Sequence, residues 1–185
     1  MSKKKVYIFL ADGFEDVEGL TVVDLLRRAE VDISTVSIKD TRQITTSRGI
    51  TLFTDCKFME TDFSNADMLV IPGGMPGTRY LAAYEPLLEL FRAFYNEGGK
   101  VAAICAAPTI FSALGFLKER KATCYPGMAD QLDCGEYLED PVVTDGNVTT
   151  SRGVGTAIPF ALSLIGQLVS EEKAAEIGSS IVFYT

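Results

Sequence analysis

The sequence of 185 residues contains no histidine. Histidine is the usual partner of a catalytic cysteine, so the Cys–His pair that many peptidases and amidotransferases use within one chain is excluded. Basic residues are also few. A count of 17 Lys and Arg against 25 Asp and Glu gives a net charge of −8, which argues against sequence-independent binding to nucleic acid.

Long apolar runs and paired cysteine motifs are missing as well. The first apolar segment, Val6–Leu10, is far too short for a signal peptide or a membrane span, so we expect a cytoplasmic protein without membrane contact. Cys56, Cys105, Cys124 and Cys134 show no C-x-x-C spacing, so we expect free thiols, no metal site and no other cofactor. No G-x-x-x-x-G-K-[ST] phosphate loop occurs, which argues against a kinase.

What is present is an alternation of short apolar strands and amphipathic helices, expected to form one domain over residues 1–185. Strands are expected at 5–10, 31–38, 68–71, 100–104 and 122–125, hairpins at 44–54 and 142–150, and helices at 15–29, 85–97, 108–114, 156–169 and 171–177. Near-continuous apolar strands of this kind predict an α/β sandwich, with a mostly parallel sheet covered by helices on both faces. Sites in such sheets form beyond the carboxyl ends of the strands, where three of the predicted loops lie: 11–16, 72–77 and 105–108.

Cys105 stands where an apolar strand meets a helix, in the segment KVAAICAAPTIF. A nucleophile elbow needs small neighbours, because the backbone packs closely there, and Ala103, Ala106 and Ala107 meet that need. A helix N-terminus lowers the pKa of a nearby cysteine, which predicts a thiolate near neutral pH without histidine. The alternative is that Cys105 is a small buried hydrophobic residue, as most free cysteines are, and for the other three cysteines we prefer that interpretation.

Two glutamates near the start of the first helix are candidate partners of this cysteine. Glu15 and Glu18 are three residues apart and share a helix face. Glu15 and Asp16, in the first turn, are expected mainly to complement the helix dipole. Glu18 lies one turn deeper and would approach the sulfur if it points toward the strand ends. A thiol and a carboxyl group in contact should share one proton, because both cannot easily be charged at once. We predict that Glu18 carries this proton and that protonated Glu18 could serve as a general acid.

Backbone amides and two arginines complete the candidate site. The segment PGGMPG at 72–77 predicts a tight turn, and in it the N–H of Gly74, together with that of Ala106, could bind an oxyanion. The pentapeptide TTSRG occurs twice, at 45–49 and 149–153. Its arginines, Arg48 and Arg152, are either surface cations or parts of an anion site, and the repetition keeps the second hypothesis open.

Four motifs together resemble the ThiJ/PfpI superfamily, in particular its parkinsonism-associated deglycase and YajL-like branch. They are ADGFEDVE at 11–18, IPGG at 71–74, AICAAP at 103–108 and TSRGVGT at 150–156. The motifs stand in matching order, and the resemblance runs from about Lys4 to the C-terminus. It implies a flavodoxin-like three-layer sandwich that forms a homodimer.

The resemblance also implies roles for individual residues. It places the nucleophile at Cys105 and a protonated glutamate at Glu18, with oxyanion contacts from the backbone amides of Gly73, Gly74 and Ala106. Glu15 and Tyr125 are further candidates to line the substrate site. Many relatives carry histidine where this chain has Tyr125, and a phenol is a poor general base near neutral pH, so we expect a modest rate.

The resemblance implies two alternative functions. The first is a cofactor-independent enzyme of the glyoxalase or deglycase type, in which Cys105 attacks the aldehyde of methylglyoxal or acts on its early adducts to give hydroxy acids. The second is a protein of the oxidative-stress response, in which Cys105 is oxidised to a sulfinic acid.

Overall fold

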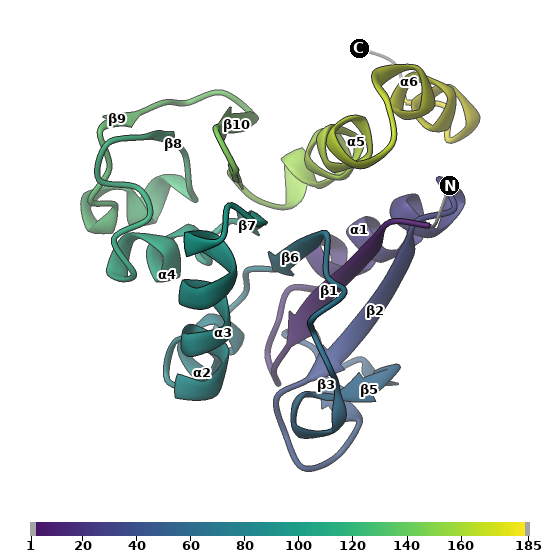
Figure 1. The fold of residues 1–185 in the computed structure, drawn as a ribbon, viewed down its shortest axis with the longest axis vertical. Helices are drawn as coiled ribbons and strands as arrows, with labels where there is room; N and C mark the ends of the chain where they lie inside the picture. The colour runs from purple at the N-terminus through teal and green to yellow at the C-terminus, as the bar shows by residue number, and fades with distance from the viewer. Residues whose placement is uncertain (1–2, 184–185) are drawn as a thin grey trace.

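The computed structural model describes residues 3–183 and builds one central sheet of seven strands (Figure 1). The strands are β1 (Lys5–Leu10), β2 (Asp32–Ser37), β5 (Cys56–Lys57), β6 (Met68–Ile71), β7 (Lys100–Ile104), β10 (Val142–Asp145) and β11 (Val148–Ser151). Their order across the sheet is β10-β11-β7-β6-β1-β2-β5. Every neighbouring pair is parallel except β10 and β11, which form an antiparallel hairpin at one edge.

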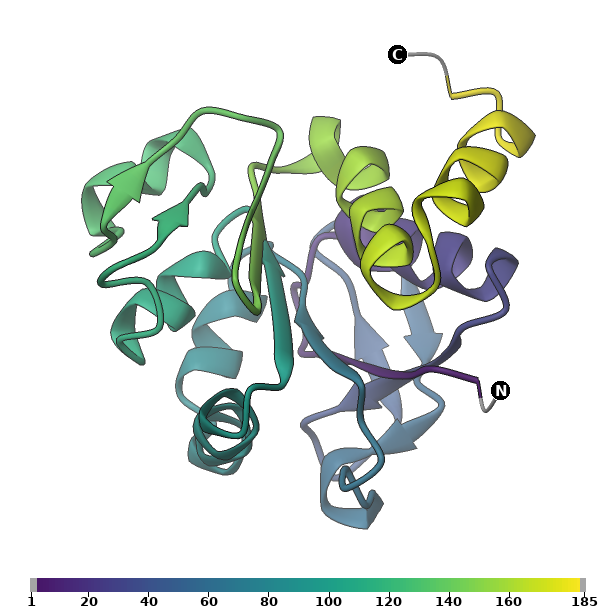
Figure 2. The same cartoon turned by 45° about the horizontal axis from the view of Figure 1, so that its top comes forward.

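Helices cover both faces of this sheet, as Figures 1 and 2 show. One face carries α1 (Asp16–Arg28), α5 (Ala157–Leu168) and α6 (Glu171–Ser180), and the other carries α2 (Gly77–Ala82), α3 (Glu85–Asn96) and α4 (Pro108–Ala113). Successive side chains of a strand point to opposite faces, so Val6 and Ile8 pack with the first set of helices and Tyr7 and Phe9 with the second. The predicted three-layer α/β sandwich is confirmed.

Short elements decorate this framework. Two small sheets pair β3 (Gln43–Thr45) with β4 (Thr51–Phe53) and β8 (Lys121–Ala122) with β9 (Glu136–Tyr137). Short 3₁₀ helices occupy Phe58–Glu60, Pro126–Gln131 and Val154–Thr156. The strand expected at 122–125 is therefore wrong in extent, because Tyr125 gives its amide to the Cys105 carbonyl instead of to a strand. Helix α2 was not predicted, since its six residues bury a single large apolar side chain, Leu81.

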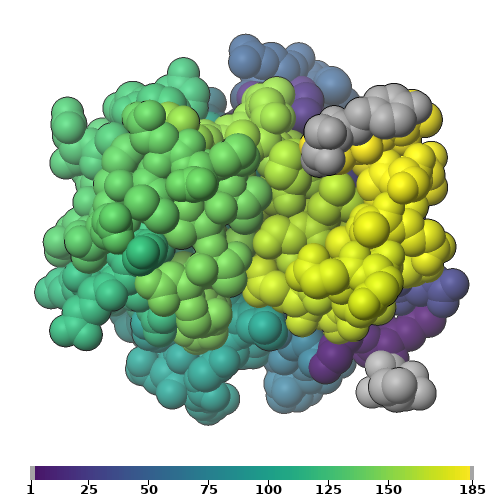
Figure 3. All heavy atoms as spheres, turned by 90° about the horizontal axis from the view of Figure 1, so that it is seen from above, coloured from purple at the N-terminus to yellow at the C-terminus, as the bar shows by residue number. Residues whose placement is uncertain are grey.

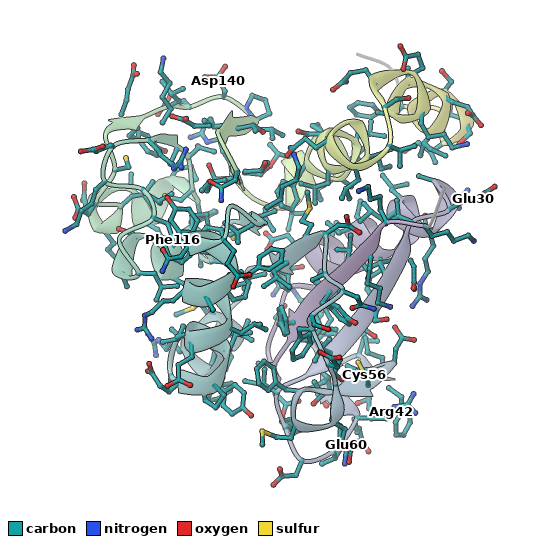
Figure 4. All side chains as sticks on the ribbon, viewed as in Figure 1. Glu30, Arg42, Cys56, Glu60, Phe116 and Asp140 are labelled. Atoms are coloured by element: carbon teal, nitrogen blue, oxygen red, sulfur yellow. The ribbon has the colours of Figure 1, made fainter. Side chains whose placement is uncertain are left out.

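Different segments of the chain form different faces of the molecule. Figure 3 looks onto a face where the green segment that includes β10 and the yellow C-terminal helices lie side by side. In Figure 4, Cys56 lies on the edge strand β5, whereas Phe116 lies beside the helices on the other side of the view. No helix within residues 3–183 is long and apolar enough to cross a membrane.

Candidate active site

The carboxyl ends of β1, β6 and β7 meet at one edge of the sheet, because these three neighbouring strands are parallel. The loops that follow them are joined by backbone hydrogen bonds: Glu15 N–H donates to Gly73 O at 2.9 Å, and Cys105 N–H donates to Ser151 O at 3.0 Å. Tyr125 N–H donates to Cys105 O at 2.8 Å. The predicted convergence of three loops is confirmed, and β11 and the segment after β8 join it.

A pocket of about 600 Å³ opens at this edge. It is lined by Glu15, Glu18, Arg48, Gly74, Cys105, Tyr125, Pro126, Arg152, Gly153, Val154, Gly155 and Thr156. Seven of the residues predicted from sequence are thus brought together. A larger hollow of about 730 Å³ lies between residues 61–67 and 90–100, but no cysteine is among the described residues that line it.

Cys105 occupies a strained turn. Its φ of 67° lies in the left-handed region that residues other than glycine rarely adopt, and such strain costs on the order of 1–3 kcal/mol. The side chain is only partly buried and lines the pocket. A strained backbone that presents a thiol to a pocket is the geometry of a nucleophile elbow, as the sequence predicted.

Gly73 allows the cysteine and the glutamate to approach each other. A Cβ atom at this position would lie 2.5 Å from the Cβ of Cys105, 2.5 Å from Oε2 of Glu18 and 2.9 Å from the carbonyl oxygen of Ile104. Only glycine therefore fits between them. The Gly73 N–H donates to Glu18 Oε2 at 3.0 Å, so this amide holds the carboxyl group and is not free for the oxyanion role that the resemblance implied.

Glu18 is completely buried, although it is an acidic residue. Its Oε1 atom has no hydrogen-bond partner among the described residues, and a buried charge with an unpaired oxygen is costly. Burial raises the pKa of Glu18 to about 7, and the charge of Glu15 also acts to raise it. The Cys105 thiol and the Gly73 amide act in the opposite direction and lower this pKa. The neutral carboxylic acid is thus well populated near neutral pH, as the shared-proton hypothesis requires.

The ionisation of the thiol differs from the prediction. Burial and the neighbouring Glu18 raise the pKa of Cys105 to about 12, although hydrogen bonds from the backbone of Ala106 and Gly74 act in the opposite direction. The expected low thiol pKa is therefore wrong for the resting pair. Helix α4 begins only at Pro108 and has six residues, so its dipole does not offset burial. That Cys105 becomes a thiolate by passing its proton to Glu18 stays a prediction.

Glu15 and the loop between β3 and β4 flank this pair. Ser47 Oγ donates to Glu15 Oε2 at 3.0 Å, and Nη2 of Arg48 lies 3.7 Å from the same oxygen. Glu15 stands at the N-cap of α1, but its side chain makes no capping hydrogen bond. Its carboxylate therefore does more than complement the helix dipole: it lines the pocket and raises the pKa of Glu18.

The opposite wall comes from Tyr125 and from the second copy of the repeated pentapeptide. Tyr125 is about half exposed, and its ring lies beside Gly153. Arg152 is mostly buried, and its Nη1 donates to the Glu139 carbonyl at 2.9 Å. The wall residues Pro126 and 153–156 were not predicted to line the site, although the TSRGVGT motif that contains most of them was a signal.

The three remaining cysteines lie outside the pocket. Cys56 donates to Thr35 O and Cys124 to Tyr125 O, while Cys134 packs against the core formed with α3 and α4. These contacts agree with structural roles for all three.

Comparison with known proteins gives consistent matches over nearly the whole chain. The model of the DJ-1/PfpI family matches residues 4–167. Protein DJ-1 homolog B of Arabidopsis thaliana is 36% identical over 183 residues, which are 98% of this chain and 42% of that protein. The protein of Schizosaccharomyces pombe named glutathione-independent glyoxalase DJ-1 is 30% identical over 186 residues, covering 96% of this chain and 97% of that one. The solved structure of oxidized Toxoplasma gondii DJ-1 superimposes with a TM-score of 0.94 at 31% identity, covering 98% and 100% of the two chains.

Proposed function

The chain belongs to the DJ-1/PfpI family, and on that basis we propose that it converts 2-oxoaldehydes such as methylglyoxal, or their early adducts, to hydroxy acids without a cofactor. The observation that carries the proposal is that the buried Glu18 carboxyl group and Cys105 lie on either side of Gly73 at the base of an open pocket. The name of the Schizosaccharomyces pombe relative supports the same reaction class. The chain offers no histidine for the Cys–His chemistry of a peptidase, whereas this reaction needs only a nucleophile and one proton carrier.

The first step joins sulfur to the substrate. With the shared proton on Glu18, the Cys105 thiolate attacks the aldehyde carbon, and a C–S bond forms as the C=O π electrons move to oxygen. Glu18 then gives its proton to that oxygen, which yields a neutral hemithioacetal. The N–H groups of Gly74 and Ala106, which lie near the sulfur, stabilise the developing oxyanion.

The second step moves hydrogen between the two carbons. The Glu18 carboxylate removes the proton from the former aldehyde carbon, which leaves an enediolate with its charge on the former ketone oxygen. The neighbouring carbon takes this proton back from Glu18, and the hydroxyl proton on the first carbon passes to the former ketone oxygen. The first carbon is thereby oxidised to a thioester while the ketone is reduced to an alcohol, so no external oxidant or reductant is consumed. Water hydrolyses the thioester, releasing the hydroxy acid and restoring the thiol.

The experiment that tests this function is lactate formation from methylglyoxal by chelator-treated protein in the absence of glutathione. Lactate should accumulate over many turnovers, at a rate that scales with protein concentration. No lactate above the uncatalysed background at micromolar protein would overturn the proposal.

A redox function is the second candidate, and a specific observation favours it: the superimposable Toxoplasma gondii structure is that of an oxidized protein. Two equivalents of hydrogen peroxide, each transferring one oxygen atom to sulfur and leaving as water, would convert the Cys105 thiolate to a sulfinate. A protonated Glu18 beside the sulfur would donate a hydrogen bond to the new oxygen atoms.

Mild peroxide is therefore expected to add two oxygen atoms to Cys105 before any other cysteine reacts. Peptide mass analysis along a peroxide series would measure this order. Glu18→Ala, which removes the hydrogen-bond donor, should let Cys105 pass on to the sulfonic acid at lower peroxide. Oxidation of Cys134 or Cys56 at the same dose as Cys105 would contradict the redox function.

We also propose that the chain forms a homodimer through the outer surface of α1 and the β3–β4 hairpin. Val17 and Leu20 are exposed on one face of α1, and Ile50 and Phe53 are exposed on the hairpin. The hairpin lies against the start of α1, since Ser47 N–H donates to Phe14 O at 2.8 Å. Neighbouring exposed apolar side chains mark an interaction surface.

Light scattering coupled to size exclusion should give twice the chain mass at micromolar concentration. Leu20→Glu places a charge in the proposed interface and should shift the protein toward the monomer, whereas Tyr80→Glu, at an exposed position on α2, should not. If the wild-type protein still has the mass of one chain at about 100 micromolar, the proposed dimer is wrong.

We place the protein in the cytoplasm. A reducing compartment would keep its four cysteines as the free thiols that the described chain contains, and the proposed reactions require a free Cys105.

A further inference from the structure

Thr156 is the last residue before α5, and its hydroxyl group does not serve that helix. A threonine at the N-cap of a helix commonly accepts a hydrogen bond from an amide of the first turn. Thr156 makes no such bond, and its side chain instead turns back to the end of β11. The hydroxyl group therefore has a use other than starting the helix.

Four polar atoms surround this one hydroxyl group. Thr156 Oγ1 accepts the N–H of Arg152 at 3.2 Å and that of Gly153 at 3.0 Å, and it donates to the Gly153 carbonyl oxygen at 2.9 Å. The buried Ser151 Oγ lies 2.7 Å away. One side chain thus fixes the path of the backbone over residues 151–153, directly beyond the carbonyl group that accepts the Cys105 N–H.

The backbone held in this way passes beside the buried acid. A Cβ atom at Gly153 would lie 3.8 Å from Oε1 of Glu18, the buried oxygen that has no hydrogen-bond partner among the described residues. Gly153 itself is partly exposed and lines the pocket. The segment 151–153 therefore lies between this oxygen and the solvent of the pocket.

We propose that Thr156 is a positioning residue, which holds the segment 151–153 against Glu18 and so keeps water from Oε1. A carboxylate that water cannot reach is costly, so the exclusion of water favours the protonated acid. This agrees with the burial that raises the pKa of Glu18 to about 7. As a statement about catalysis the proposal rests on the proposed function, in which Glu18 holds and returns a proton.

Other titratable and charged groups also face Glu18, and their effects have to be separated from that of water. They are Cys105, Glu15, Arg48, Tyr125 and Arg152. Among them only Arg152 has a hydrogen bond to Thr156. Moving this cation away from Glu18 would raise the pKa of the acid, whereas admitting water would lower it, so the direction of the shift distinguishes the two causes.

Thr156→Val tests the proposal, because valine has nearly the shape of threonine and lacks the hydroxyl group. The amides of Arg152 and Gly153 lose their acceptor, so water should reach Oε1 and the pKa of Glu18 should fall by about one unit, part of the rise that burial produces. Carbon NMR of the Glu18 carboxyl group, in protein with isotopically labelled glutamate, would measure this pKa. The signal that disappears in Glu18→Gln assigns it.

Three further variants separate the hydroxyl group from a general loss of structure. Thr156→Ser keeps the hydroxyl group and should retain the wild-type pKa of Glu18. Thr61→Val removes a hydroxyl group that donates to the Lys57 carbonyl oxygen, outside the pocket, and should also leave this pKa unchanged. Thr156→Ala lacks the hydroxyl group without adding a methyl group beside the two amides, so it should lower the pKa as well and replaces Thr156→Val if that variant does not fold.

An unchanged pKa of Glu18 in folded Thr156→Val or Thr156→Ala would overturn the proposal. A rise would overturn it too, because the segment would then act through the charge of Arg152, and so would an equal fall in Thr156→Ser. The outcome is separable from that of the proposed function. Protein that forms no lactate but shows the expected fall keeps the positioning role and loses the glyoxalase assignment, whereas lactate formation with an unchanged pKa does the reverse.

Discussion

Cys105→Ser is expected to lower the rate of lactate formation from methylglyoxal by at least about 10³-fold, the scale of loss typical when the nucleophile of a covalent mechanism is removed. A serine hydroxyl is nearly isosteric with the thiol, so it can occupy the same turn. The serine hydroxyl is a far weaker acid than the thiol, however, so Glu18 cannot take its proton at neutral pH. The rate would be measured as lactate released per minute under saturating methylglyoxal.

Cys134→Ser is the matched control, because Cys134 is also a partly buried free thiol but packs away from the pocket. It should keep the wild-type rate. Both variants should unfold at similar denaturant concentrations, which would show that loss of activity in Cys105→Ser is not loss of the fold. If Cys105→Ser retained a tenth of the activity or more, sulfur would not be the nucleophile.

Glu18→Gln is expected to change how stability depends on pH. In the folded protein the pKa of Glu18 is raised to about 7, above its ordinary value of 4.5, because the carboxyl group is buried. Between pH 4.5 and 7 the folded state therefore holds a proton that the unfolded chain releases. The free energy of unfolding falls as pH rises through this window, by about 1.4 kcal/mol per unit and about 3 kcal/mol in total.

Glutamine has the shape of the protonated acid but cannot lose a proton, so the variant should lack this fall. The free energy of unfolding of Glu18→Gln minus that of the wild type should therefore be about 3 kcal/mol larger at pH 7.5 than at pH 4.5. Urea unfolding at several pH values would measure this difference. Glu89→Gln, on the exposed side of α3, should follow the wild-type profile. Parallel profiles for Glu18→Gln and the wild type would show that Glu18 titrates normally and does not share a proton with Cys105.

Both variants test one proposal, which is that Cys105 and Glu18 share a single proton inside the fold. The enzymatic and redox functions each require it. In the first, the proton is donated and recovered within the catalytic cycle, whereas in the second it stabilises the oxidised sulfur. Relative rates of lactate formation and of peroxide oxidation at the same pH would therefore show which use of the thiolate dominates.

Much of the fold followed from the sequence because the sheet is covered on both faces. The strands expected at 5–10, 68–71 and 100–104 match β1, β6 and β7 to the residue. Their apolar runs are continuous, since helices bury alternate side chains on each side. Helix α2 and the two-residue strands β5 and β9 escaped prediction, because two residues, or six that bury one large apolar side chain, show too little periodicity.

The sequence by itself determined which residues meet. Parallel strands bring their carboxyl ends to one edge, so Cys105, Glu18 and the Gly73-Gly74 turn had to converge there, and four motifs in order indicated the family. Only the tertiary structure decided how these groups behave. Burial, which no local pattern encodes, raises the pKa of both Cys105 and Glu18. The loops that meet at this edge commit the Gly73 amide to the Glu18 carboxyl group and bring Arg48 and Arg152 to one pocket. Ionisation and hydrogen-bond availability depend on neighbours distant in sequence, and those are fixed only when the chain has folded.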